Sequence, residues 1–165
     1  LREIGRAEDA EKTYEALIEK IKTDKRLGKE EKEDFVEEVN YTLSNVYIDL
    51  KKVNKATEVL EKLLEKNPDN PTYLNDLGYV LADNNLRLEE KKFEEAKKLL
   101  LEAVKDEEGR HIEILDHLAD VHEALGEKQN ALKVWKEGLE VVTPSKRDQD
   151  KKSEVEKKIK RLTGQ

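Results

Sequence analysis

Residues 37–70 read EEVNYTLSNVYIDLKKVNKATEVLEKLLEKNPDN and predict two amphipathic helices joined by a turn near Lys51-Lys52. Asn67-Pro68 closes the second helix, because proline cannot continue a helix. Apolar side chains recur at helical spacing in both halves, at Leu43, Val46, Tyr47, Leu50, Ala56, Val59, Leu60, Leu63 and Leu64. This stretch therefore predicts a helix–turn–helix unit.

The unit resembles a tetratricopeptide repeat, a helical hairpin whose period is about 34 residues. The small and large positions of that family are met by Leu43-Ser44, Tyr47, Ala56, Leu60 and Pro68. Leu77-Gly78 stands one period after Leu43-Ser44, so the pattern recurs. The resemblance implies an all-α, right-handed superhelical solenoid of antiparallel helix pairs. The charged tail, with Val155, Ile159 and Leu162 on one stripe, fits a C-terminal capping helix.

We expect one domain over 1–165, because the pattern covers nearly the whole chain. Residues 1–29 would hold a partial repeat and a connector, 30–70 a repeat, 71–110 an irregular repeat, 111–145 a repeat and 146–165 the capping helix. In the partial repeat, a second helix would run from Arg6 to Lys22, with Leu1–Gly5 left from the first helix. Pro71 would lie in the first turn of the following helix, behind an Asn cap.

The pattern is irregular before Phe93, because Ala56 and Ala96 are 40 residues apart. Leu86–Glu90 and Lys91–Ala96 both read as the opening of a second helix. Either the segment between two helices is elongated, or about one repeat is missing between Glu90 and Lys91. The chain also starts at Leu1, contains no Met and opens midway through a repeat, so we expect a fragment and leave its localisation open.

Composition excludes several classes of function. A net charge of −7 argues against a nucleic-acid surface, and no apolar run approaches the ~20 residues of a membrane span. The chain has no cysteine, no glycine-rich phosphate loop and no recognisable nucleophile motif. Glu113 and His117 share a helix face, but no second histidine completes a metal site, and Trp135 fits a core position. We expect no enzyme activity, no metal and no cofactor.

The resemblance implies that the first helix of each repeat lines a concave groove. The candidate partner-binding residues on these helices are Tyr41, Asn45, Asp49, Asn75, Asp76, Tyr79, Asp83, Asp116, His117 and Asp120. With Glu38, Glu113 and Glu123, the groove positions hold eight acids and no Lys or Arg. The family's carboxylate clamp lacks its cations here, although Asn45 stands at one of its positions. The surface would favour a basic ligand, unless it is only a solvated helix face.

We therefore expect a non-enzymatic scaffold that binds a protein or peptide segment, possibly basic, in an acidic and polar groove. A self-associating module is the alternative, with a homodimer formed through the apolar face of Tyr14, Leu17 and Ile21. A third hypothesis is an accessory domain of a larger protein.

Overall fold

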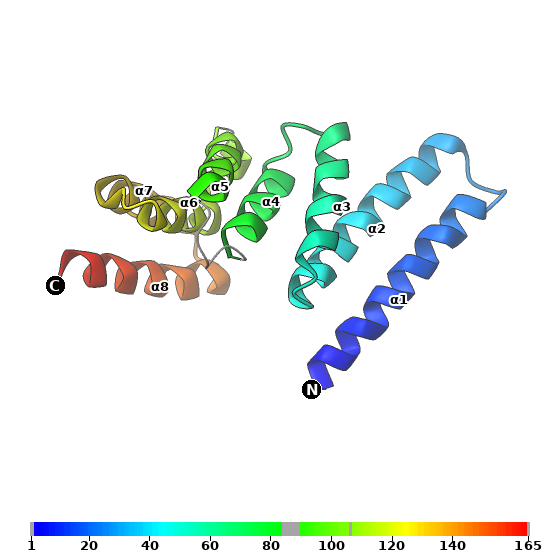
Figure 1. Cartoon of the computed structure of the whole chain (residues 1–165), viewed down its shortest axis with the longest axis horizontal. Coiled ribbons are helices and arrows are strands. Elements are labelled where there is room, and N and C mark those ends of the chain that lie inside the picture. Colours follow the sequence, from blue (N-terminus) through cyan, green and yellow to red (C-terminus); the bar gives the residue numbers. More distant parts are fainter. Residues whose placement is uncertain (1, 84–89, 106, 165) are drawn as a thin grey trace. The chain divides into compact units, whose positions relative to one another are not determined.

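The computed structural model describes residues 2–83, 90–105 and 107–164 of the chain, and all the regular secondary structure in them is helical. The chain divides into two compact units, Leu1–Pro68 and Asp69–Gln165. The first unit contains α1 (Arg2–Thr23), α2 (Lys29–Asp49) and α3 (Val53–Lys66) (Figure 1). The second contains α4 (Pro71–Asp83), α5 (Glu90–Ala103), the 3-10 helix η1 (Glu107–Gly109), α6 (Ile112–Ala124), α7 (Lys128–Glu140) and α8 (Lys146–Thr163). Consecutive helices pack against one another within each unit, which confirms the all-α prediction of helix pairs.

The first helix is longer than the sequence predicted. α1 begins at Arg2, so residues 2–5 continue this helix and are not the end of an earlier one. Gly5 lowers helix propensity by about 1 kcal/mol, which is too little to stop a helix that good helix formers extend on both sides. The apolar side chains that α1 and its neighbours bury in the first unit are Ile18, Leu43, Tyr47, Ala56, Leu60 and Leu63.

A polar network joins α1 to α2 and α3 within the first unit. Lys52 and Lys55 both bind the buried carboxylate of Glu11, with 2.9 Å from Lys55 Nζ to Glu11 Oε1. The hydroxyl of Tyr47 donates a hydrogen bond of 2.9 Å to Glu15. Burial, followed by the nearby Glu15 carboxylate, raises the pKa of Tyr47 to about 12. Tyr47 therefore stays neutral, and its hydroxyl group remains a hydrogen-bond donor to Glu15 of α1.

The predicted turns are confirmed. Lys51 has a φ of 56°, in the left-handed region, and this reverses the chain between α2 and α3. Pro71 begins α4, and Asn70 Oδ1 accepts hydrogen bonds from the backbone N–H groups of Thr72 and Tyr73, at 3.0 and 3.2 Å. The asparagine thus supplies a cap to donors that the first turn leaves unpaired.

Gly78 lies where α4 and α5 approach closely. A Cβ atom at this position would lie 2.9 Å from Leu100 Cγ and 3.3 Å from the carbonyl oxygen of Ala96. Gly78 stands one period after Ser44 in the repeat pattern, and the geometry shows that a small residue is needed there. The irregular stretch before α5 is different, because residues 84–89 lie outside the described residues. Whether the segment is elongated or a repeat is missing stays untested.

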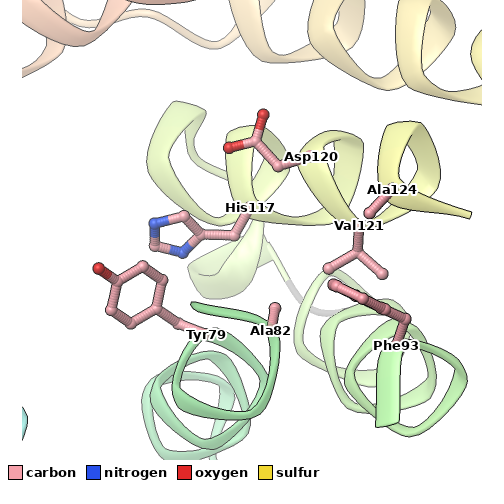
Figure 2. Close-up of a pocket in the computed structure, with 7 residues that line it drawn as sticks. All are labelled: Tyr79, Ala82, Phe93, His117, Asp120, Val121 and Ala124. Atoms are coloured by element: carbon pink, nitrogen blue, oxygen red, sulfur yellow. The ribbon is translucent and has the colours of Figure 1, made fainter. Parts of the chain in front are cut away.

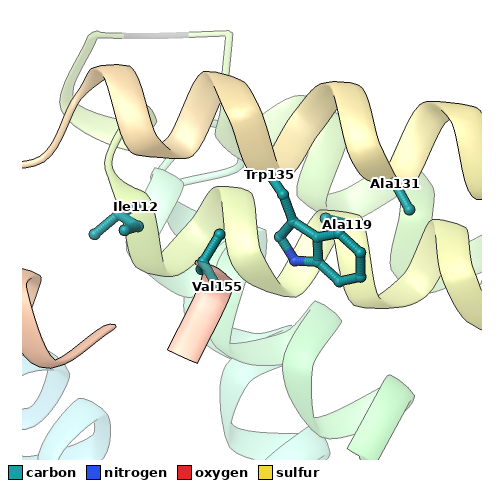
Figure 3. Packing of buried hydrophobic residues seen from close by; sticks show 5 residues of the cluster. All are labelled: Ile112, Ala119, Ala131, Trp135 and Val155. Atoms are coloured by element: carbon teal, nitrogen blue, oxygen red, sulfur yellow. The ribbon is translucent and has the colours of Figure 1, made fainter. Parts of the chain in front are cut away.

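The last helix covers the end of the second unit, as predicted. Trp135 of α7 and Val155 of α8 are fully buried in a cluster with Ile112, Ala119 and Ala131 (Figure 3). Ile159 and Leu162 pack against the same cluster, so the narrow apolar stripe of α8 faces inward. The remaining face of α8 is strongly charged, which suits a helix at the end of a stack.

Candidate functional site

One face of α6 carries four acids that are paired with bases of α8. Glu113 pairs with Arg147, and Glu123 pairs with Arg161. Lys158 lies between two carboxylates, 2.7 Å from Asp116 Oδ1 and 2.6 Å from Asp120 Oδ2. Residue numbers rise together along both helices, so α6 and α8 run parallel. The acids that the sequence assigned to a ligand surface on α6 are thus engaged inside the chain.

Asp116 is the most deeply placed of these acids, at 2% exposure. Its Oδ1 accepts a hydrogen bond of 2.9 Å from the indole N–H of Trp135, in addition to the bond from Lys158. Lys151 Nζ lies 3.4 Å from its other oxygen. Its carboxylate faces α7 and α8, so the structure gives Asp116 a role in fixing the cap.

Asn75 of α4 and His117 of α6 were both predicted as groove residues, and the structure brings them together. Asn75 Oδ1 lies 3.0 Å from His117 Nδ1, and the amide nitrogen of Asn75 donates to Asp76 Oδ1 at 3.0 Å. Since the asparagine oxygen can only accept, His117 carries its proton on Nδ1. Burial lowers the pKa of His117 to about 4, so the imidazole is neutral at pH 7.

A pocket of about 220 Å³ opens beside this histidine, between α4, α5 and α6 (Figure 2). The Tyr79 and His117 rings lie next to one another, with 4.7 Å between centroids and an angle of 32° between planes. Figure 2 shows Phe93 reaching from α5 toward Val121 of α6. The lining residues are Tyr79, Ala82, Phe93, His117, Asp120, Val121 and Ala124. The walls are mostly apolar, and Asp120 supplies the only carboxylate among these lining residues.

The surroundings of the Asp120 carboxylate disfavour its charged form. Burial raises the pKa of Asp120, and the negative charge of Asp116 adds to that effect. The hydrogen bond from Lys158 acts in the opposite direction. Asp120 is therefore a weaker attractant for a cation than an exposed aspartate would be.

The candidate residues of the first unit form a looser set on α2. Asn45 Nδ2 donates to the carbonyl oxygen of Tyr41 at 3.2 Å, so this amide is bound to its own helix. Tyr41 is half-buried and Asp49 is exposed. The side chain of the remaining candidate, Asp83 of α4, lies outside the described part of the structure.

Residues 37–70 match the family model described as tetratricopeptide repeat. These residues form a tetratricopeptide repeat. Solved structures agree with this fold. TTC0263, a thermophilic protein of this family from Thermus thermophilus, has a TM-score of 0.69 and 21% identity, over 99% of this chain and 79% of its own.

Two further structures share the tetratricopeptide repeat fold of this chain. PcrH, in complex with the chaperone binding region of PopD, has a TM-score of 0.68 and 16% identity, over 80% of this chain and 93% of PcrH. MamA has a TM-score of 0.65 and 16% identity, over 99% of this chain and 90% of its own. At these identities the likeness shows the fold. None of the curated proteins compared with this chain matches it.

Sequence reasoning missed part of the site. Phe93 was read only as an apolar residue of its helix, and Val121 and Ala124 were not singled out, yet all three line the pocket. The partnership of α6 and α8 was also missed. A general signal was present, because the predicted helix of α6 carries four acids and no Lys or Arg, whereas α8 is rich in Lys and Arg.

Two further findings concern the residues that the structure describes. In this part of the chain, no group of three or more His, Asp or Glu side chains is placed to hold a metal ion. Among the described helices, none combines the length and the apolar character needed to cross a bilayer.

Proposed function

We propose that the chain is a non-enzymatic interaction module that binds a segment of another protein on the first-helix faces of its repeats. Tetratricopeptide repeat proteins mediate protein–protein interactions, and the PcrH structure contains a bound region of a second protein. In this chain the supporting observation is the pocket between α4, α5 and α6. Its concave, mainly apolar lining with a few polar groups is typical of a recognition site.

The pocket argues for an apolar or aromatic anchor from the partner. Tyr79, Phe93 and Val121 offer contact surface, and His117 is neutral, so neither strong attraction nor repulsion of charge arises there. The basic partner favoured by the sequence rested on eight acids, of which the four on α6 are paired with α8. Within the first unit, Glu38 and Asp49 of α2 are exposed, so a basic segment would be favoured on that face.

The test is to fill the pocket without disturbing the helices. Ala124 lines the pocket and is exposed, so Ala124→Phe places a ring there, whereas Ala124→Ser leaves it open. A random peptide library displayed on phage is selected on the unmodified chain, and each enriched peptide is measured against both variants. We expect enrichment of peptides with a large apolar residue, about tenfold weaker binding to Ala124→Phe and unchanged binding to Ala124→Ser. Equal binding to both variants would place the ligand elsewhere.

Self-association remains the second candidate, and one observation favours it. Leu17 of α1 is 38% exposed, beside the half-buried Tyr14 and Ile21. A second copy that covered this face would bury apolar area that the isolated chain leaves in water. Sedimentation over a concentration series separates the two proposals, because a chain that stays monomeric at high concentration excludes the homodimer.

A further inference from the structure

The pocket between α4, α5 and α6 is called the first-helix pocket below. The first unit holds a second cavity of different character. It has a volume of about 300 Å³ and lies among α1, α2 and α3. Its lining residues are Ile18, Lys22, Val36, Glu37, Asn40, Val59, Lys62, Leu63 and Lys66. A neighbouring hollow of about 290 Å³ shares Lys22, Val36 and Lys66 with it and adds Lys29, Lys32 and Glu33. We call this continuous surface the lysine-rimmed cavity.

Its charge is opposite to that of the chain. Five lysines and two glutamates line the lysine-rimmed cavity, in a protein whose net charge is −7. Helix ends account for only part of this. Lys22 and Lys66 lie in the last turns of α1 and α3, where a cation is favourable to the helix dipole. Lys29 and Lys32 lie at the beginning of α2, where the same dipole disfavours a cation. Helix stability therefore does not explain their presence.

The lysines of the rim are weakly engaged. Lys29 Nζ lies 3.7 Å from Glu33, and Lys66 Nζ lies 3.8 Å from Glu37, beyond hydrogen-bonding distance in both cases. Lys32 Nζ donates to the carbonyl oxygen of Lys22 at 3.1 Å. This bond uses one of the three N–H donors of the ammonium group.

The other two lysines of the rim have close partners on their own helices. Lys22 pairs with Glu19 and Lys62 with Glu58, at 2.8 and 2.6 Å, in pairs that are more than half exposed. Exposed pairs of this kind contribute little to stability, so an incoming carboxylate could replace them.

The floor of the cavity is aliphatic. Ile18 and Leu63 are buried there, and Val36 and Val59 are half-buried. No arginine and no aromatic ring stands among the residues named for the lining, whereas nucleic-acid surfaces rely on both. An aliphatic floor inside a ring of ammonium groups matches a peptide with carboxylates on both sides of an aliphatic side chain.

We propose that the lysine-rimmed cavity binds an acidic protein segment, with an aliphatic side chain on the floor and the flanking carboxylates on Lys29, Lys32 and Lys66. This site is separate from the proposed first-helix pocket. It would bind an acidic segment, whereas the exposed acids of the α2 face would favour a basic one.

The probe is a short fluorescein-labelled peptide in which pairs of Glu flank single Leu residues, measured by fluorescence anisotropy with the whole chain. The test variant is Lys32→Gln with Lys66→Gln. Its matched control is Lys133→Gln with Lys136→Gln, which removes the same charge at exposed positions of α7. Circular dichroism confirms equal helicity. Three further probes replace Glu by Gln, replace Leu by Ser, or consist of single-stranded DNA.

We expect the test variant to weaken binding of the Glu–Leu peptide about tenfold and the control to change it less than about twofold. Both substituted peptides should bind more weakly, and added salt should reduce affinity. Absence of binding by the Glu–Leu peptide, equal loss in the two variants, undiminished binding of the Gln peptide, or tighter binding of DNA would each overturn the proposal. Ala124→Phe should leave this binding unchanged, so failure here is distinct from failure of the first-helix pocket.

Discussion

The indole N–H of Trp135 donates a 2.9 Å hydrogen bond to the carboxylate of Asp116, and both residues are almost completely buried. Asp116 comes from α6 and Trp135 from α7, while Lys158 of α8 binds the same carboxylate oxygen. One acid thus ties together three helices of the second unit. Because two of its partners are cations, its own burial is compensated, and the cap is held by charge as well as by apolar contact.

We predict that Asp116→Ala destabilises the second unit by roughly 2–4 kcal/mol, because it leaves Trp135 Nε1 without its acceptor and deprives Lys158 of one carboxylate. Asp116→Asn should cost about half as much, since the amide oxygen still accepts from the indole. Urea unfolding followed by the fluorescence of Trp135, the single tryptophan, measures this unit. A loss below about 0.5 kcal/mol in Asp116→Ala would show that the contacts of Asp116 do not stabilise the packing of α8.

Two helical glycines should respond in opposite ways to the same substitution. A Cβ at Gly138 would lie 3.4 Å from Leu115 Cβ, an ordinary contact, so Gly138→Ala should stabilise by about 0.5–1 kcal/mol through helix propensity. At Gly78 the added atom would lie 2.9 Å from Leu100 Cγ, and Leu100 is fully buried. Overpacking there should cancel or reverse the gain. Thermal unfolding of both variants checks this, and equal stabilisation would refute the close approach of α4 and α5.

We predict a pH dependence that belongs to His117. Its pKa is about 4 in the folded chain, because of burial, against 6.5 for an unperturbed histidine. Below pH 6.5 the unfolded chain binds a proton at His117 and the folded chain does not. The contribution of the neutral histidine to the free energy of unfolding is therefore fully present above that pH. It should fall by on the order of 2 kcal/mol as pH decreases toward 4.

The control for this prediction is His117→Gln, which cannot titrate. Asp120, whose pKa is raised by burial, works in the opposite direction in acid, and the comparison of the two proteins largely cancels its effect. Urea unfolding at a series of pH values between 4 and 7 gives the difference in free energy. A difference that does not change with pH would show that His117 is not shielded from water.

Much of the fold was readable from local pattern. The apolar period of residues 37–70, the cap at Asn70-Pro71 and the close contact at Gly78 depend on residues near in sequence or one period apart. Helix propensity, proline geometry and side-chain periodicity act over such short ranges, so the sequence reveals them. The start of α1 was misplaced because the repeat pattern assigned residues 1–5 to an earlier helix, whereas the structure continues α1 through them.

The site was less predictable. Residue type and repeat position marked Asn75, Tyr79 and His117, which do lie together. The same reasoning gave Asp116 a place in the groove, although it is buried under α8. In the sequence, an aspartate in an exposed groove cannot be told from one that is buried. Its role depends on whether a cation from another helix lies beside it.

The sequence by itself therefore determined that this chain consists of paired helices, where most of them turn, and which faces are apolar. Only the tertiary structure decided that the acids of α6 neutralise α8, that a neutral His117 borders an apolar pocket, and that lysines from three helices surround one cavity. The physical reason is range. Backbone conformation follows from neighbours along the chain, whereas burial and the pairing of charges depend on residues brought near only by folding.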